Sequence, residues 1–221
     1  MAVDGAQVRD EQVYERLHKA IVSGELSPGE RLVEEELAEK LGETRSVVHT
    51  ALIRLSHDGI VVRERNRGAH VRRISLRDAI EVLEARRAIE SLAAGYAAIR
   101  RTDEDVAYLS RLVGEMEELT SSGQLLELSE RNAALHGRIL EISGHSVAIE
   151  VARRLRSQVV RFQFRTVLAP GRSVRSFAEH QRLVEAIAAG DPPAAEAAMR
   201  QHLTHVLEAL EEMAVHEPMF V

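Results

Sequence analysis

The fold is decided by residues 31–55, which read RLVEEELAEKLGETRSVVHTALIRL. Apolar residues recur at helical spacing over residues 32–41, and this pattern predicts a short helix that ends at Gly42. Thr44 or Ser46 can cap a following helix, whose apolar residues again share one side. Two helices joined by so short a turn are typical of a helix-turn-helix.

The segments on either side extend this motif. Residues 13–21 have helical periodicity and predict a preceding helix. Residues 60–64 and 69–72 have the pattern of two short strands, and the tight turn between them is typical of a β-hairpin. Three helices followed by a hairpin predict a winged helix-turn-helix, so residues 1–74 are expected to form a DNA-binding domain.

The remaining residues, 75–221, carry no strand signals. Five or six long amphipathic helices are expected, with N-caps at Thr102, Ser143 and Asp191. We therefore predict a mainly α protein whose second domain is an all-helical antiparallel bundle. The breaks between its helices are expected near residues 101–103, 121–123, 143–144, 169–171 and 190–193.

Composition excludes several classes of protein. The 221-residue chain has no cysteine, which rules out disulfide scaffolds and cysteine-ligated zinc or iron–sulfur sites. No apolar run reaches the roughly 20 residues that a membrane span needs, and the acidic amino-terminal segment does not fit a secretory signal. We expect a cytoplasmic protein with no membrane partner.

Charge is unevenly distributed along the chain. The formal net charge is −6, yet residues 45–73 contain seven basic and two acidic side chains. A basic segment within an acidic protein indicates a surface that faces phosphates. A solvated, arginine-rich face is the simpler alternative.

The second helix of the motif is the candidate recognition helix. Its first residues are expected to face base edges, with Arg45 able to contact guanine through two hydrogen bonds. Residues of the wing are expected to reach the minor groove or a phosphate. The alternative is that these arginines form surface ion pairs with Glu43 or Glu64. The predicted DNA-binding residues are Thr44, Arg45, Ser46, His49, Thr50, Arg67, Gly68 and His70.

Four polar residues of the second domain are candidate metal ligands. Asn132 and His136 are four apart and share one helix face, while His180 and His202 lie on later helices. Three imidazoles and an oxygen converging from three helices suit Zn²⁺, Ni²⁺ or Mn²⁺. From spacing alone, partly buried structural histidines are the more common alternative.

The first domain resembles the GntR family of bacterial transcription regulators. The resemblance is carried in order by AIVSGELSPGERL at residues 20–32, ELAE at 36–39, TRS at 44–46 and NRGA at 66–69. The sequence departs from the family within the recognition helix, where Val47, His49 and Thr50 replace the common Pro, Arg and Glu. The resemblance implies a winged helix that binds an operator, and the departure at His49 leaves the operator sequence open.

The second domain is similar to the helical effector domain of the FadR subfamily. The similarity lies in LEARRAIE at residues 83–90, NAALHGRILEISG at 132–144 and EHQRLVEAIAAGD at 179–191. In the metal-binding branch of that subfamily, the first acid and three histidines are ligands, which implies a metal site at Asn132, His136, His180 and His202. Asn132 replaces the commoner Asp and brings no charge.

The resemblance also implies a small organic carboxylate as effector, anchored by Arg86. The alternative is a permanent ion pair between Arg86 and Glu90. Arg161 and Arg165 are further candidates for lining the effector pocket, although both could be surface arginines.

The leading hypothesis is therefore a ligand-responsive regulator that binds double-stranded DNA, is not an enzyme and, as is most common in this family, represses transcription. A palindromic operator needs one winged helix per half-site, so a homodimer is expected. Two alternatives remain at this point. One is a regulator with a metal-free pocket for an acyl ligand, and the other is a metal-dependent hydrolase.

Overall fold

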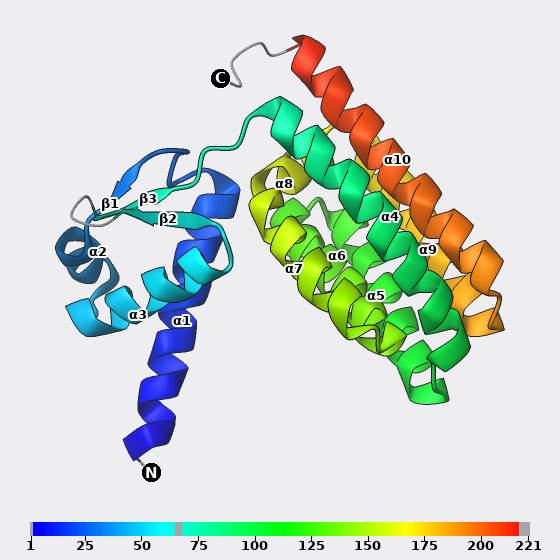
Figure 1. The fold of residues 1–221 in the computed structure, drawn as a ribbon, viewed down its shortest axis with the longest axis horizontal. Helices are drawn as coiled ribbons and strands as arrows, with labels where there is room; N and C mark the ends of the chain where they lie inside the picture. The colour runs from blue at the N-terminus through cyan, green and yellow to red at the C-terminus, as the bar shows by residue number, and fades with distance from the viewer. Residues whose placement is uncertain (1, 65–67, 217–221) are drawn as a thin grey trace. The chain divides into compact units, whose positions relative to one another are not determined.

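The structure is a computed structural model that describes residues 2–64 and 68–216 (Figure 1). The chain divides into two compact units, residues 1–74 and residues 75–221. The architecture is mainly α, as predicted: a small three-stranded sheet belongs to the first unit, and the described part of the second is helical. No helix of the described residues combines the length and the apolar character that a membrane span requires.

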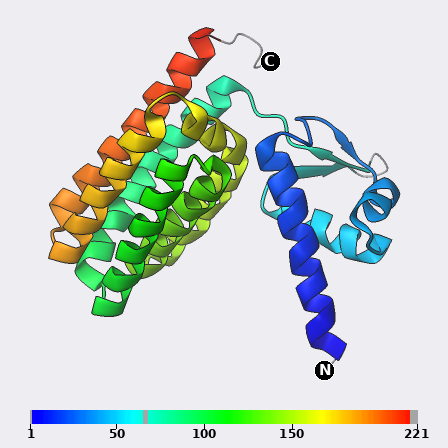
Figure 2. The same cartoon turned by 180° about the vertical axis from the view of Figure 1, so that it is seen from behind.

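The first unit is a winged helix-turn-helix. Its sheet is antiparallel with the order β1-β3-β2, so the two wing strands pair with each other and β1 closes one side. α1 packs against α3, as Figure 2 shows from behind. The elements are α1 (Ala2–Ser23), β1 (Arg31–Leu32), α2 (Glu34–Leu41), α3 (Arg45–His57), β2 (Val61–Glu64) and β3 (Gly68–Val71).

The start of the second helix differs from the prediction. Helical periodicity placed Leu32 and Val33 in that helix, but Leu32 belongs to β1 and pairs with Ala69 of the wing. Val33 is the N-cap and has an extended backbone. A buried Leu32 is compatible with both a helix and a strand, and its pairing with β3 makes it part of a strand.

The recognition helix begins and ends as its sequence requires. The Thr44 side chain is the N-cap and accepts a hydrogen bond from the amide of Val47. Gly42, which ends α2, has a φ of 70°, a conformation that glycine adopts without strain. Val48 and Leu52 of α3 are buried in the core of the unit, so the polar start of the helix stays at the surface.

The second unit is a bundle of seven helices within the described residues. The sequence predicted five or six, because nothing at Val159 signals the break between α7 and α8. The cap at the start of α7 also differs from the prediction: His145, and not Ser143, accepts the capping hydrogen bond. The helices are α4 (Leu76–Arg100), α5 (Asp103–Ser122), α6 (Leu125–Ser143), α7 (Ser146–Gln158), α8 (Val160–Leu168), α9 (Arg172–Ala189) and α10 (Pro192–His216).

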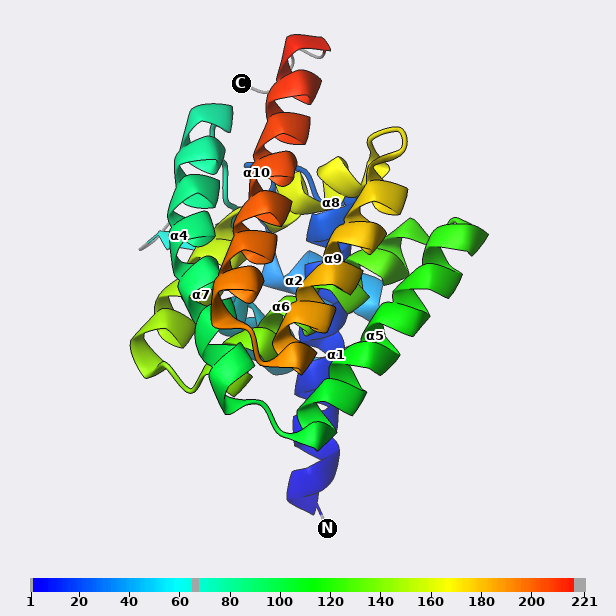
Figure 3. The same ribbon diagram turned by 90° about the vertical axis from the view of Figure 1, so that its right-hand side faces the viewer.

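Helix α4 is central to this bundle. It packs against α6, α7, α9 and α10, and Figure 3 shows α10 lying beside both α4 and α9. The core consists of leucine, isoleucine, valine, methionine and alanine side chains, in keeping with the scarcity of aromatic residues. Within this apolar interior lie several buried polar residues, and these form the candidate metal site.

Candidate functional site

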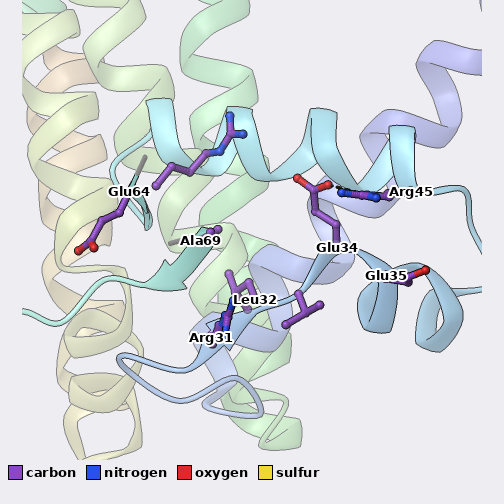
Figure 4. Close-up of a pocket in the computed structure, with 10 residues that line it drawn as sticks. Arg31, Leu32, Glu34, Glu35, Arg45, Glu64 and Ala69 are labelled. Carbon is purple, nitrogen blue, oxygen red and sulfur yellow. Dashed lines mark hydrogen bonds and ion pairs between the residues drawn. The ribbon is translucent and has the colours of Figure 1, made fainter. Parts of the chain in front are cut away.

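The amino-terminal end of α3 forms one side of a groove in the first unit (Figure 4). Thr44, Arg45 and Ser46 are exposed, whereas His49 and Thr50 are half-buried. The groove has a volume of about 470 Å³, and both arginines and glutamates line it. Its charged residues are Arg31, Glu34, Glu35, Arg45, Arg63 and Glu64.

Of the predicted residues of the wing, Gly68 lines the groove. Gly68 is exposed at the start of β3, with a φ of 86°, and His70 is half-buried on the same strand. Arg67 lies outside the described residues. The DNA-binding role of all eight predicted residues stays a prediction, which their position at the start of α3 and in the wing supports.

Glu34 holds two of the predicted DNA-binding side chains. Its Oε2 accepts a hydrogen bond of 3.0 Å from Arg45 Nε, and its Oε1 lies 2.6 Å from His49 Nδ1 (Figure 4 draws the Arg45 pair). The hydrogen bond from His49, together with Arg45, lowers the pKa of Glu34 although partial burial opposes this. The partner of Arg45 is thus Glu34 and not Glu43, which sequence reasoning had considered.

Three histidines of the second unit converge in its interior. His136 comes from α6, His180 from α9 and His202 from α10, and each is at most 2% exposed. Their ligand nitrogens lie within 4.8 Å of one another, with 3.3 Å between Nε2 of His136 and Nε2 of His180. Two nitrogens bound tetrahedrally at about 2.1 Å from zinc would lie about 3.4 Å apart. The spacing therefore fits a metal ion.

The other nitrogen of each ring has a polar neighbour. His136 Nδ1 lies 2.7 Å from Glu90, and His202 Nδ1 lies 2.8 Å from Glu179. His180 Nδ1 lies 3.5 Å from the hydroxyl of Ser176. Such partners orient imidazoles toward a metal, because they fix the tautomer and leave Nε2 to coordinate. The sequence analysis assigned none of these partners a role in holding the ligands.

Burial keeps the three imidazoles neutral. It lowers the pKa of His136 to about 4, against the opposing effect of Glu90. Burial likewise lowers the pKa of His180 and of His202. A neutral imidazole is the form that binds a metal, so near pH 7 the cluster is ready to coordinate without losing protons.

The orienting acids remain ionised despite their burial. Burial alone would raise the pKa of Glu90, but Arg86 and His136 lower it overall. Burial also raises the pKa of Glu179. The hydrogen bond and charge of His202 lower it more strongly, Arg172 adds to this effect, and the resulting pKa is about 2. Each acid therefore carries a negative charge beside a histidine of the cluster.

Asn132 lies one turn before His136 on α6, as its spacing predicted. Its Oδ1 is buried and has no hydrogen-bond partner among the described residues. The same side chain lines a cavity of about 30 Å³ together with His202 and Arg172. An unpartnered buried oxygen beside three imidazoles fits the fourth position of a metal site.

The arginines predicted to bind an effector have different surroundings. Arg86 is fully buried, and its Nε donates a hydrogen bond of 2.7 Å to Glu90. When the Gln163 amide is oriented so that both of its polar atoms are satisfied, its oxygen accepts a second hydrogen bond from Arg86 at 2.8 Å. Arg86 thus forms the ion pair that was the alternative to an effector role. Arg161 and Arg165 are half-buried on α8, and the pKa of Arg161 is lowered by burial and by Arg165. The effector role of all three stays a prediction.

Sequence reasoning missed Arg172, the first residue of α9. This side chain is 3% exposed and donates from Nη2 to Glu179 at 2.9 Å. Its Nε and Nη1 are buried without a partner in the described part of the chain. Arg172 follows Gly171 outside every motif that carried the family resemblance, so the sequence contained no signal for it.

Comparisons with known proteins identify the family. Residues 81–205 match the FCD domain, and residues 9–71 match the family described as bacterial regulatory proteins, gntR family. The chain belongs to the GntR family. This regulator is 29% identical over 215 residues to the HTH-type transcriptional regulator LutR of Bacillus subtilis, covering 86% of this chain and 95% of LutR. It is also 26% identical to the HTH-type transcriptional repressor RspR of Escherichia coli, covering 92% and 90% of the two chains.

Solved structures agree in fold. The chain superposes on McbR/YncC of E. coli with a TM-score of 0.79 at 21% identity, covering 93% of this chain and 98% of that chain. A putative GntR regulator from Rhodococcus gives a TM-score of 0.72 at 21% identity, with the same coverage. The family and its named relatives make this protein a DNA-binding transcriptional regulator and not an enzyme, which excludes the metal-dependent hydrolase.

Proposed function

We propose that this GntR regulator is a cytoplasmic homodimeric repressor whose second unit binds a divalent transition metal and a small organic carboxylate. The observation that carries the proposal is the convergence of three buried imidazoles whose Nδ1 atoms all face polar partners. This arrangement leaves three Nε2 atoms to coordinate, and Asn132 Oδ1 adds an oxygen. Residues 75–221 thus act as the effector domain.

The donor set favours Zn²⁺ or Ni²⁺, with Mn²⁺ as a further candidate. Imidazole nitrogens suit these ions, whereas Mg²⁺ and Ca²⁺ prefer shells made of oxygen. Asn132 contributes no negative charge, so the bound ion retains its full positive charge. An anionic effector is attracted to such a site, and a metal supplies an open coordination position for one of its oxygens.

The small cavity supports a small effector over an acyl chain. Ligand pockets for organic molecules usually exceed about 300 Å³. The cavity beside His202 has about 30 Å³, which leaves no room for an acyl chain. This size favours the metal-and-carboxylate reading over a metal-free acyl pocket.

The first unit, residues 1–74, reads the operator in this proposal. Arg45 contacts a guanine, the neighbouring residues at the start of α3 position the helix in the major groove, and the wing holds the backbone. One winged helix covers one half-site, so two copies are needed for a palindrome. Effector binding changes operator affinity if the carboxylate binds one arrangement of the dimer better than the other.

Operator binding by Arg45→Ala tests the DNA-binding assignment. We expect selection from random double-stranded DNA with the full chain to return a palindrome, on which loss of the guanine contact weakens binding about 5- to 150-fold at fixed salt. The matched control is Arg77→Ala, since Arg77 is an exposed arginine of α4 that pairs with Glu81. Equal affinities of the wild type and Arg45→Ala would contradict the assignment. Activation of a promoter carrying this palindrome in transcription assays would contradict repression.

A further inference from the structure

Glu34 has a fixed place beside the start of the recognition helix α3. It is the first residue of α2, and it comes shortly after Leu32, which is buried and pairs with Ala69 in the sheet. Leu37, one turn further along α2, is buried in the same core. A paired strand on one side and a packed helix on the other therefore hold the backbone of Glu34, so its carboxylate has a defined reach toward α3.

Glu34 engages Arg45 through a nitrogen that base recognition does not need. The hydrogen bond of 3.0 Å joins Arg45 Nε to Glu34 Oε2 (Figure 4). The Arg45 side chain is 71% exposed, and its Nη1 and Nη2 have no partner among the described residues. An arginine reads guanine with two N–H donors that contact O6 and N7. The terminal groups of Arg45 thus stay available for a base, while the bond to Glu34 restricts a side chain that would otherwise lose its freedom on binding.

The other oxygen of Glu34 determines which nitrogen of His49 is left for DNA. Glu34 Oε1 lies 2.6 Å from His49 Nδ1. The hydrogen bond from His49, followed by that from Arg45, lowers the pKa of Glu34, so the carboxylate is ionised and can only accept hydrogen bonds. The hydrogen of this bond is therefore on Nδ1. In a neutral ring, Nε2 is then a hydrogen-bond acceptor.

The charge of Glu34 also acts against contacts that carry no sequence information. Arginines and protonated histidines are attracted to phosphates, and phosphate contacts do not distinguish one base pair from another. A carboxylate between Arg45 and His49 repels phosphates at this position. It thereby favours base edges over the DNA backbone, at some cost in affinity for DNA of any sequence.

We infer that Glu34 is a positioning residue that sets the operator specificity of α3. It directs the terminal groups of Arg45 to a guanine and leaves Nε2 of His49 to accept a hydrogen bond from the exocyclic amine of an adenine or a cytosine. These amines are the base-edge donors of the major groove. The inference rests on the proposed operator contact of Arg45 and extends it to a second base pair. Glu34 costs affinity through its charge and improves discrimination through its two hydrogen bonds.

Selection from random double-stranded DNA, followed by binding of the full-length protein to altered operators, tests the second contact. The buffer is held at about pH 8, where an unperturbed imidazole is neutral. Residues four apart on a helix are about 6 Å apart and successive base pairs about 3.4 Å, so the two positions should lie on the order of two base pairs apart. Replacing the adenine by purine, or the cytosine by 2-pyrimidinone, removes the exocyclic amine. We expect this change to weaken the wild type at least about threefold more than it weakens His49→Ala.

Variants of Glu34 test its positioning role. In Glu34→Gln, the ratio of affinities for the operator and for an operator exchanged at either position should fall at least about threefold, while affinity for DNA of any sequence rises. Glu34→Asp keeps the charge on a shorter side chain, so discrimination should fall without that rise. Glu39→Gln is the matched control, because Glu39 is an exposed residue of α2 outside the groove, and it should bind and discriminate like the wild type. Melting curves establish that each variant is folded.

The outcomes separate this inference from the contact on which it rests. Full discrimination at both positions in folded Glu34→Gln would overturn the inference alone, and so would an equal effect of amine removal on the wild type and on His49→Ala. Equal operator affinities of the wild type and Arg45→Ala would overturn the proposed guanine contact and the inference with it.

Discussion

Metal binding should stabilise the protein by an amount that can be worked from the structure. The candidate ligands come from α6, α9 and α10, so the site exists only when these three helices are packed together. An ion that binds only the folded state at about 100 times its dissociation constant stabilises that state by about 2.7 kcal/mol. For a protein of about 150–250 residues, each kcal/mol raises the melting temperature by roughly 2–4 °C. The expected rise is therefore about 5–10 °C.

The assay is differential scanning fluorimetry of chelator-treated protein titrated with Zn²⁺, Ni²⁺ or Mg²⁺. We expect Zn²⁺ and Ni²⁺ to raise the melting temperature of the wild type and Mg²⁺ to leave it unchanged, since nitrogen ligands do not suit Mg²⁺. His180→Ala removes a central ligand and should abolish the rise. His57→Ala is the matched control, because that side chain is 91% exposed and lies outside the second unit.

Two results would refute the reasoning. An equal rise with Zn²⁺ in the wild type and in His180→Ala would place the binding ion elsewhere. A wild type that melts at the same temperature with and without Zn²⁺, in protein shown by mass spectrometry to start metal-free, would mean that the histidines are structural. Loss of His180 also leaves a buried gap, so the comparison is made between the metal-induced shifts and not between absolute melting temperatures.

The remaining predictions concern charges at the two sites. Glu34→Gln removes the carboxylate that competes with DNA phosphates and bases for Arg45, so operator affinity measured by fluorescence anisotropy should rise about two- to fivefold, the range expected for a partly exposed ion pair. Glu35→Gln, in the same groove, is its control, and equal effects of the two changes would argue against a specific role for Glu34. Asn132→Asp should tighten zinc binding and weaken the binding of a small carboxylate such as propionate, because it adds one negative charge at the cavity. Zinc competition with a chelating dye and calorimetry measure the two effects, and a change of both affinities in the same direction would count against the arrangement.

Much of the fold could be predicted because local chemistry fixes the ends of the helices. Gly42, Gly123 and Gly190 end α2, α5 and α9 in left-handed conformations, and Thr102 forms a capping box with Asp105. The incorrect predictions concern positions where the local sequence contains no capping or breaking residue. No glycine or proline marks the break at residue 159, and the apolar residue at position 32 fits a helix as well as a strand.

The candidate sites were predictable to a different extent. The histidines recur at spacings that place one on each of three helices, and the family resemblance connects them. Glu34 and Arg172 could not be found in this way, because their roles come from contacts that depend on the packed structure. Glu34 meets the recognition helix 11 and 15 residues further along the chain, and the unpartnered donors of Arg172 become evident only when burial and neighbours are known.

Glu179 connects the buried Arg172 to the candidate metal site. One of its oxygens accepts from Arg172 and lies 2.8 Å from His202 Nδ1, and the other lies 2.7 Å from His205 Nδ1. An anion that pairs with Arg172 weakens the hold of Arg172 on Glu179. Glu179 then accepts more strongly from His202, which makes His202 Nε2 a better metal ligand. Anion and metal affinities are then coupled, and linkage requires the coupling to be equal in both directions. The metal would therefore tighten effector binding by the same factor by which the effector tightens metal binding, and we expect this coupling to pass through Glu179.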